Sequence, residues 1–427
     1  MLSEQKPKVL LDISLLGHDP SVWRGMERVA KNLFDGLRAA NQCDLSFVST
    51  SHLVGAHDFL AAQEGSLETA LRRRPGQLQL SRLGSRLSKI VHRSIANRSL
   101  PARAGRRTLA QVVQACSAGE SRLTPAMLRH TDIYHSPYLP FPKAVRAAAH
   151  LRKFVTVYDF NPLKYPQFFS GRDTQYINGL KACLTRDNFA FSISETVRND
   201  ILEFCAIPPE RIFLTPLAAD HRTFYPETDP QRIAESRARH GIPEGPYFLS
   251  LSAHSPQKNF AHLIHCFGAL VESGELTDTS LVLVGPNPQR NPEVRQTLEQ
   301  YPRAQSRVII TGLVPDVQLA AVYSGATAFL FPSFCEGFGI PPLEAMQCGT
   351  PVIASNATAI PEVVGDAGIL LPPTDKEAWC QAMLQLARQS NLRAELRKKS
   401  LARAALFTWE RFIQQTLYGY KSSLTIA

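Results

Sequence analysis

The stretch ATAFLFPSFCEGFGIPPLEAMQCGTPVIAS, residues 326–355, carries the pattern of a strand, a glycine-containing loop, a helix and a second strand. Its apolar start is typical of a buried strand in a parallel sheet. The paired prolines, the helix formers after them and Gly349 predict where the helix begins and ends. Open sheets built from such units bind ligands beyond the carboxyl ends of their strands. The stretch therefore predicts an α/β fold with a ligand site at the glycine loop.

Two glutamates stand on either side of this loop. Glu336 follows the predicted strand, and Glu344 is expected in the first turn of the helix. Either acid alone has an ordinary explanation, because loop glutamates are usually solvated and a helix dipole favours acids in its first turn. Here, however, the acids flank glycines at a strand end, where the free amides of a helix start suit phosphate. We therefore favour a site for a phosphorylated ligand.

The length and composition predict a multidomain globular protein. A chain of 427 residues is too long for one ordinary core, so we expect two or three domains. We expect no secretory signal and no membrane span, because no apolar run is long enough. The eight cysteines lack metal-binding spacing and several lie in apolar runs, which predicts reduced thiols in a cytoplasmic protein.

The net charge of +10 is concentrated in one segment, which we call the basic segment. No acidic residue occurs between Glu68 and Glu120, whereas basic residues are frequent there. The basic residues are Arg72, Arg73, Arg74, Arg82, Arg86, Lys89, Arg93, Arg98, Arg103, Arg106 and Arg107. Such a basic face predicts an anionic partner, either a membrane or nucleic acid. Nucleic acid is disfavoured, because the arginines are not interleaved with aromatic residues that could stack on bases.

Residues 80–93 of the basic segment have helical period. Apolar side chains fall on one side, and Arg82, Arg86, Lys89 and Arg93 fall on another. One interpretation is an interfacial helix that rests on anionic lipid, peripheral on the cytoplasmic face of a membrane. The other is an ordinary surface helix whose apolar side packs on the first domain.

The order of apolar runs predicts two similar halves. From Tyr247 onward, strand-like and helix-like segments alternate, which is typical of a doubly wound parallel sheet. The first half alternates in the same way but is interrupted by the basic insertion, about residues 56–129. We expect two Rossmann-like domains, residues 1–220 and 221–405, that face a central cleft. Residues 406–427 are expected to form a helix that packs back across the junction.

Two further loops have the pattern of phosphate-binding turns. In SAHSPQKNF, residues 252–260, Lys258 follows a predicted strand and precedes a helix, where a lysine can reach a phosphate. In RGMERV, residues 24–29, Gly25 permits close approach of a ligand, and Arg24 and Arg28 supply positive charge. Two halves that each aim a loop at one cleft predict an enzyme that holds one substrate on each half.

Residues 333–371, SFCEGFGIPPLEAMQCGTPVIASNATAIPEVVGDAGILL, resemble the signature of the retaining glycosyltransferases of the GT-B fold, family 4. The likeness includes that family's two glutamates with seven residues between them. Shorter likenesses occur in RGMERV, ISETVRND, LTPLAAD, TGLVPD and TWERF. The resemblance implies a GT-B fold and the transfer of a hexose from a nucleotide sugar.

Carried over position by position, the resemblance implies roles for individual residues. Glu344 would bind the ribose hydroxyls of the donor nucleotide, and Glu336 would lie beside the transferred sugar. Lys258 would neutralise the leaving diphosphate. Asp159 joins Glu336 and Lys258 as a candidate catalytic residue. The other donor-binding positions are Gly337, Phe338, Gly339, Ile340, Gln257, Gly312, Leu313, Val314 and Gly25.

Two positions depart from the family pattern. The family usually has Arg-Lys-Asn where this chain has Gln257, Lys258 and Asn259, so one diphosphate cation is missing. Candidates to replace it are Arg24, Arg28 and His254. The family often has a histidine, as acceptor-side general acid/base, where this chain has Tyr158. Both departures also fit a catalytically silent relative that binds a sugar nucleotide or acts as a partner subunit.

The reaction implied by the resemblance retains the anomeric configuration. The acceptor would attack the face that the diphosphate leaves, and the diphosphate would take the proton. No Asp-x-Asp pair occurs, so we expect cations and helix amides, rather than a metal or cofactor, to stabilise the leaving group. The form EGFGIPPLEAM is most similar to mannosyl- and rhamnosyltransferases, which favours GDP-mannose over a UDP- or dTDP-sugar. The expected acceptor is a glycan or lipid-linked saccharide of polysaccharide or lipopolysaccharide biosynthesis.

Overall fold

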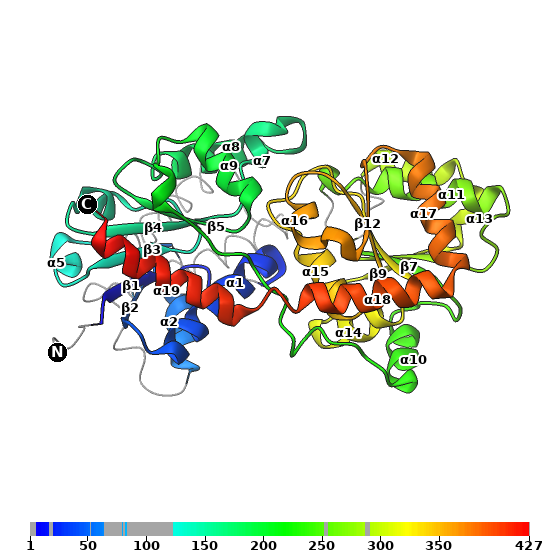
Figure 1. The fold of residues 1–427 in the computed structure, drawn as a ribbon, viewed down its shortest axis with the longest axis horizontal. Coiled ribbons are helices and arrows are strands. Elements are labelled where there is room, and N and C mark those ends of the chain that lie inside the picture. The colour runs from blue at the N-terminus through cyan, green and yellow to red at the C-terminus, as the bar shows by residue number, and fades with distance from the viewer. Residues whose placement is uncertain are drawn as a thin grey trace, which may run out of the picture.

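The computed structural model describes residues 6–16, 20–51, 53–63, 79, 82, 123–251, 255–286 and 291–426. Two α/β units lie side by side, each built around a parallel sheet (Figure 1). The predictions for the helix at residues 80–93, apart from Arg82, for His254 and for the side chain of Arg24 lie outside the described residues.

The first unit contains a six-stranded sheet in the order β2-β1-β3-β4-β5-β6. Every pair of neighbouring strands is parallel. The strands are β1 (Lys8–Asp12), β2 (Asp44–Val48), β3 (Ile133–Ser136), β4 (Arg152–Val157), β5 (Phe189–Ser192) and β6 (Ile212–Leu214). The helices described in this unit are α1 (Pro20–Ala40), α2 (Leu53–Ala61), α5 (Pro125–Leu128), α6 (Lys143–Ala147), α7 (Asn161–Lys164), α8 (Gly171–Lys181) and α9 (Glu195–Phe204).

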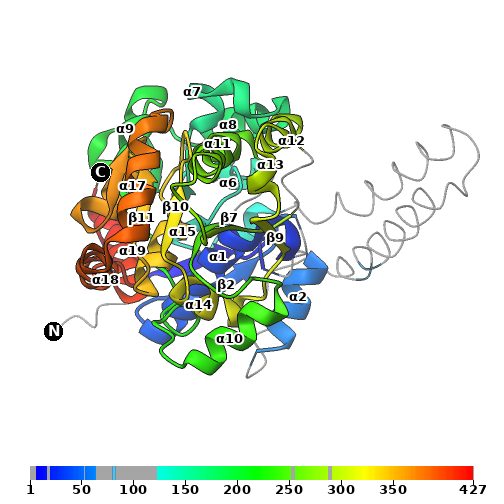
Figure 2. The same ribbon diagram turned by 90° about the vertical axis from the view of Figure 1, so that its right-hand side faces the viewer.

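The second unit contains a six-stranded parallel sheet in the order β12-β11-β10-β7-β8-β9. Its strands are β7 (Tyr247–Leu251), β8 (Ser280–Val284), β9 (Val308–Gly312), β10 (Ala328–Phe331), β11 (Val352–Ser355) and β12 (Ile369–Leu371). Its helices are α10 (Pro230–Arg239), α11 (Phe260–Glu272), α12 (Pro292–Glu299), α13 (Pro302–Gln305), α14 (Asp316–Ser324), α15 (Ile340–Gln347), α16 (Ile360–Val364), α17 (Lys376–Arg388) and α18 (Ser390–Ala404). Helices cover both faces of this sheet, with α11 above it and α14 below it in Figure 2. The predicted doubly wound α/β architecture is therefore confirmed.

Burial on both faces explains why these strands are continuous apolar runs. All residues of β8, SLVLV, and of β10, AFLF, are buried. The order of the second sheet reverses between β7 and β10, because β8 and β9 lie to one side and β11 and β12 to the other. At such a reversal the loops that follow the two central strands diverge and leave a crevice for ligands. The loops that carry Lys258 and Glu336 meet at this position.

The C-terminal helix α19 (Trp409–Thr425) returns to the first unit. It packs against α1, β5 and β6, whereas α18, just before it, packs in the second unit (Figure 1). The Tyr420 hydroxyl lies 2.6 Å from Nδ1 of the fully buried His135, whose Nε2 lies 2.9 Å from the Thr156 hydroxyl. The core of the first unit therefore includes residues from the end of the chain. The last strand of the first sheet ends at Leu214, and the first strand of the second sheet begins at Tyr247. The predicted limit between the two domains, residues 220 and 221, lies between these strands.

Two expected helix limits differ from the structure. Helix α15 begins at Ile340, so Glu344 is its fifth residue and does not lie in the first turn. Gly339, at φ 130°, forms the cap, and the first turn is taken up by Ile340 and the two prolines. Helix α1 begins at Pro20, so residues 24–29, which were expected to form a loop, lie within this helix. No helix among the described residues is long and apolar enough to cross a membrane.

Candidate active site

The Lys258 ammonium and the Glu336 carboxylate form an ion pair at the reversal of the second sheet. Lys258 Nζ lies 2.5 Å from Glu336 Oε1, and the two side chains are 20% and 16% exposed. The two loops are joined by a backbone bond in which Phe334 N donates to Gln257 O at 2.8 Å. Asn259, in the left-handed region, donates to the carbonyl oxygens of Pro332 and Pro373. The pair is therefore held on a fixed backbone.

Asp159 faces this pair from the first unit, just after β4. Burial raises the pKa of Asp159 from 3.8 to about 6, and the nearby carboxylates of Glu336 and Asp200 add to this effect. A hydrogen bond from Asn161 N, 3.0 Å to Asp159 Oδ1, and the charge of Lys258 oppose it. The structure thus brings the three candidate catalytic residues together, with one carboxyl that can gain or lose a proton near neutral pH.

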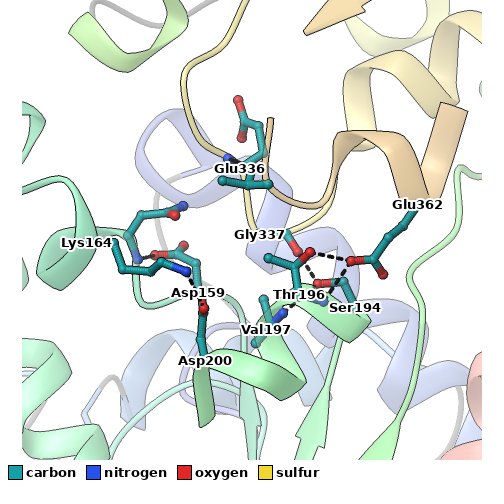
Figure 3. A network of polar contacts seen from close by, with 11 residues as sticks. Asp159, Lys164, Ser194, Thr196, Val197, Asp200, Glu336, Gly337 and Glu362 are labelled. Carbon is teal, nitrogen blue, oxygen red and sulfur yellow. Dashed lines mark hydrogen bonds and ion pairs between the residues drawn. The ribbon is translucent and has the colours of Figure 1, made fainter. Parts of the chain in front are cut away.

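Gly337 packs directly against the backbone of the first unit. A Cβ at this position would collide with the backbone carbonyl of Tyr158 and touch the Asp159 side chain. The Ser194 hydroxyl donates to Gly337 O at 2.8 Å, as Figure 3 shows. The need for glycine here comes from the contact between the units. The Tyr158 hydroxyl is buried and has no hydrogen-bond partner among the described residues, and burial raises its pKa.

A second contact between the units caps helix α9. The Glu362 carboxylate, from α16, accepts hydrogen bonds from the backbone N–H groups of Glu195 and Thr196, both at 2.7 Å, and from the Thr196 hydroxyl (Figure 3). An acid at this position satisfies free N–H groups and complements the helix dipole. Within the first unit, Lys164 Nζ lies 2.6 Å from Asp200 Oδ1. The bonds to Glu362 fix the first unit against the second beside the glycine loop.

Glu344 lies apart from Glu336, in a cavity of about 200 Å³ lined by both units. Its side chain is 5% exposed. Arg28 Nη1, from α1, lies 2.6 Å from Glu344 Oε1, and the Tyr323 hydroxyl donates to Oε2 at 3.0 Å. Arg28 Nη2 also lies 2.8 Å from Asp316 Oδ2. Burial raises the pKa of Glu344, and the charge of Arg28 opposes this.

The other predicted donor-binding residues fall into four places. Gly25 and Ile340 line the cavity that contains Glu344. Gly337, Phe338 and Gly339 form the turn between Glu336 and α15. Gly312, Leu313 and Val314 lead from β9 to α14, where Leu313 is 56% exposed and Val314 is buried. The Gln257 side chain accepts a hydrogen bond from the Ser255 hydroxyl and supplies no charge.

Several residues at the site were not singled out from the sequence. Phe168 and Phe334 stack across the cleft, with ring centroids 5.1 Å apart. The others are Ser194, Asp316, Tyr323 and Glu362. Ser194 and Glu362 lie in the segments ISETVRND and AIPEVVG, which carry the family likeness, but a contact between them cannot be inferred from either segment alone.

Comparisons with known proteins agree with this arrangement. The profile of the family described as glycosyl transferases group 1 matches residues 245–389. O-antigen chain mannosyltransferase B of Escherichia coli is 30% identical over 290 residues, which cover 68% of this chain and 74% of that protein. The serotype-specific mannosyltransferase WbdA of Escherichia coli is 29% identical over 57% of this chain, but the match spans only 30% of WbdA.

A solved structure shows the same fold along the whole chain. Sucrose-phosphate synthase from Thermosynechococcus elongatus superposes with a TM-score of 0.64 and 21% identity, covering 99% of this chain and 100% of that chain. The expected GT-B fold, with two Rossmann-like units facing a cleft, is confirmed. By its similarity to mannosyltransferase B along most of that protein, the chain belongs to the glycosyl transferases group 1 family and is a glycosyltransferase.

Proposed function

We propose that this glycosyltransferase moves a hexose, with mannose favoured, from a nucleotide diphosphate sugar to a glycan or lipid-linked saccharide. The observation that carries the proposal is the separation of the two glutamates. Glu344 lies in a cavity beside α15, whereas Glu336 pairs with Lys258 opposite Asp159. This separation suits a donor that spans the loop, with its nucleoside at one end and its sugar at the other. The finer assignment to family 4 stays a prediction.

The nucleoside end of the donor is assigned to the cavity that holds Glu344. A buried carboxylate binds the paired hydroxyls of a ribose strongly, because both hydroxyls donate to a charged acceptor. The exposed Leu313, between β9 and α14, offers an apolar surface to the base. GDP is favoured over UDP and dTDP as the nucleotide. The mannosyltransferase names of the relatives support this choice.

The sugar end is assigned to the space beside Glu336 and Asp159. In the proposed reaction an acceptor hydroxyl attacks the anomeric carbon on the face from which the diphosphate departs, so the configuration is retained. The C–O bond to the diphosphate breaks as the new glycosidic bond forms, and the hydroxyl proton passes to the leaving diphosphate. No protein nucleophile and no cofactor takes part. Asp159 acts on the acceptor side, where its carboxyl orients the acceptor hydroxyl through a hydrogen bond.

Charge on the leaving diphosphate is proposed to be stabilised without a metal ion. Lys258 supplies one cation from the end of the short helical turn Pro256–Lys258. At the start of α15, Pro341 and Pro342 have no N–H group and Leu343 N donates to Gly339 O, so the N–H groups proposed to receive the anion are those of Gly339 and Ile340. Fixed charges and dipoles of this kind stabilise a developing anion without reorganising.

The acceptor is proposed to be a growing glycan of polysaccharide or lipopolysaccharide biosynthesis. The O-antigen name of mannosyltransferase B supports this class. The proposed location is cytoplasmic, with the basic segment peripheral on an anionic membrane and no role for nucleic acid.

Thermal denaturation with GDP, UDP and dTDP tests the donor assignment, because a ligand that binds only the folded protein raises its melting temperature. We expect GDP to give the largest rise. Failure of all three nucleotides to raise the melting temperature would contradict the proposal. Binding without transfer from GDP-mannose to any saccharide acceptor would instead favour a catalytically silent relative.

A further inference from the structure

Arg28 occupies the carboxylate that the proposed function assigns to the donor ribose. Its guanidinium bridges Glu344 at 2.6 Å and Asp316 at 2.8 Å, and it lies over the Phe224 ring, 5.3 Å from the centroid. Arg28 belongs to the first unit, and both carboxylates belong to the second. The side chain therefore bridges the two units at the carboxylate that would bind the ribose.

Arg28 and Tyr323 cover the carboxylate that a ribose would need. Oε1 of Glu344 is bonded to Arg28 and Oε2 to the Tyr323 hydroxyl, and the side chain is only 5% exposed. Each carboxylate oxygen can accept more than one hydrogen bond, but two vicinal hydroxyls also need room beside the carboxylate, and Arg28 covers it. We therefore expect binding of the donor to move Arg28 away from Glu344.

The same cavity offers the released guanidinium a second anionic partner. Arg28 and Ile340, the first residue of α15, both line this cavity. The start of α15, which is proposed to receive the diphosphate, therefore lies in the same cavity as Arg28. Two other described cations line this cavity, Lys31 and Arg222, and both are more than half exposed and paired with neighbouring carboxylates. Arg28, at 29% exposure, is the cation that faces the interior.

Release of Arg28 from Glu344 does not require the units to separate. The bonds from the start of α9 to Glu362, and from Ser194 to Gly337, join the units without involving Arg28. The stack of Phe168 on Phe334 adds a third contact. A rotation of one long side chain is therefore enough to exchange partners while the cleft stays closed.

We propose that Arg28 is a displaceable occupant of the ribose position that turns to the diphosphate when the donor binds. The proposal rests on the proposed function. It predicts opposite effects of Arg28 on the two parts of the nucleotide: competition with the nucleoside and attraction for the diphosphate. Arg28 then supplies the second cation that Gln257 does not provide, and the empty site is kept closed to nucleosides that lack phosphate.

Isothermal titration calorimetry of the full chain with GDP and UDP, each alongside its nucleoside, tests this inference. The main variant is Arg28→Met, which removes the charge and donors but keeps an apolar stem on Phe224. The control is Arg38→Met, on the last turn of the same helix, where the arginine also lies over a ring, that of Phe34. Mildly alkaline buffer keeps Glu344 ionised.

We expect Arg28→Met to bind the nucleoside about tenfold more tightly and the diphosphate about tenfold more weakly, each a change of about 1.4 kcal/mol. Arg38→Met should leave both affinities at the wild-type values. Equal weakening of nucleoside and diphosphate, or no change in either, would overturn the inference.

A second variant covers the case in which Arg28→Met does not fold. Arg28→Lys keeps the charge but cannot bridge two carboxylates, so the nucleoside should still bind more tightly than in wild type. Weaker nucleoside binding by Arg28→Lys would overturn the inference. A failure of the proposed function looks different: the wild type would bind none of the nucleotides, or Glu344→Gln would leave nucleoside affinity unchanged.

Discussion

Lys258 Nζ lies 2.5 Å from Glu336 Oε1, and this pair joins the loops that follow β7 and β10. These strands are neighbours in the second sheet although β8 and β9 lie between them in the sequence. The pair is therefore a product of the strand order, and it sets one positive and one negative charge at the entrance to the crevice. In the proposed reaction the lysine faces the leaving diphosphate and the glutamate faces the sugar.

Lys258→Ala should reduce transfer from the nucleotide sugar by at least about a hundredfold, because loss of one group that stabilises the developing anion costs about 3 kcal/mol. Initial rates with labelled GDP-mannose measure this effect.

Wild-type activity should persist in excess EDTA. Activity that disappears with EDTA and returns with manganese would contradict the metal-free mechanism.

Asp159→Asn should lower transfer strongly but stabilise the fold at neutral pH. Below pH 3.8 the carboxyl is protonated in both the folded and the unfolded chain; between 3.8 and about 6 only the unfolded chain ionises, so stability falls as pH rises. A shift of this size corresponds to about 3 kcal/mol. Melting temperatures measured across this pH range should fall for the wild type and less for the variant. A variant with wild-type transfer rates would contradict the role of Asp159.

Tyr420→Phe should destabilise the first unit by about 1–3 kcal/mol, because Nδ1 of the buried His135 loses its partner. Burial lowers the pKa of His135 from 6.5 to about 3, so stability should fall as pH decreases through this range. Tyr418→Phe, at a hydroxyl-bearing ring that is 66% exposed, is the matched control. Urea denaturation of both variants measures the difference. Equal stability of the two would contradict a stabilising role for the hydrogen bond between Tyr420 and His135.

Local patterns predicted the second unit well. The run AFLF forms β10, VIAS forms β11, and the helix between them ends before Gly349. These features depend on apolar runs and turn residues that lie close together in the sequence. Glu336 after β10 and Lys258 after β7 were found for the same reason. The exact start of α15 was missed, because Gly339 adopts φ 130° and the helix begins only after it.

Local sequence patterns did not predict the contacts between the two units. Arg28 and Glu344 are 316 residues apart, and Thr196 and Glu362 are 166 residues apart. Their pairing depends on how two separately built sheets meet, which neither hydrophobic period nor turn chemistry determines. Gly337 was predicted to bind the donor. The structure shows a second reason for glycine at this position, because a side chain would collide with the backbone of Tyr158.

The basic segment should bring the protein to anionic vesicles. Each basic residue near such a surface contributes about 1 kcal/mol, so the four side chains Arg82, Arg86, Lys89 and Arg93 suffice for reversible binding at low salt. Cosedimentation with anionic, but not zwitterionic, vesicles is expected, and added salt should reverse it by screening. Replacement of all four residues by Gln should release a folded protein. If that variant still sediments, the membrane interpretation is wrong.

The two glutamates provide the most direct test of the account. Glu344→Ala should weaken binding of the nucleoside diphosphate by about tenfold or more, because a charged acceptor for two ribose hydroxyls is lost. Glu336→Ala should leave that affinity close to the wild-type value and lower the rate of transfer. The measurement is the dissociation constant of GDP for the wild type and both variants, by calorimetry. A large loss for Glu344→Ala alone is the predicted result, and equal losses for both variants would contradict the assignment of the pair.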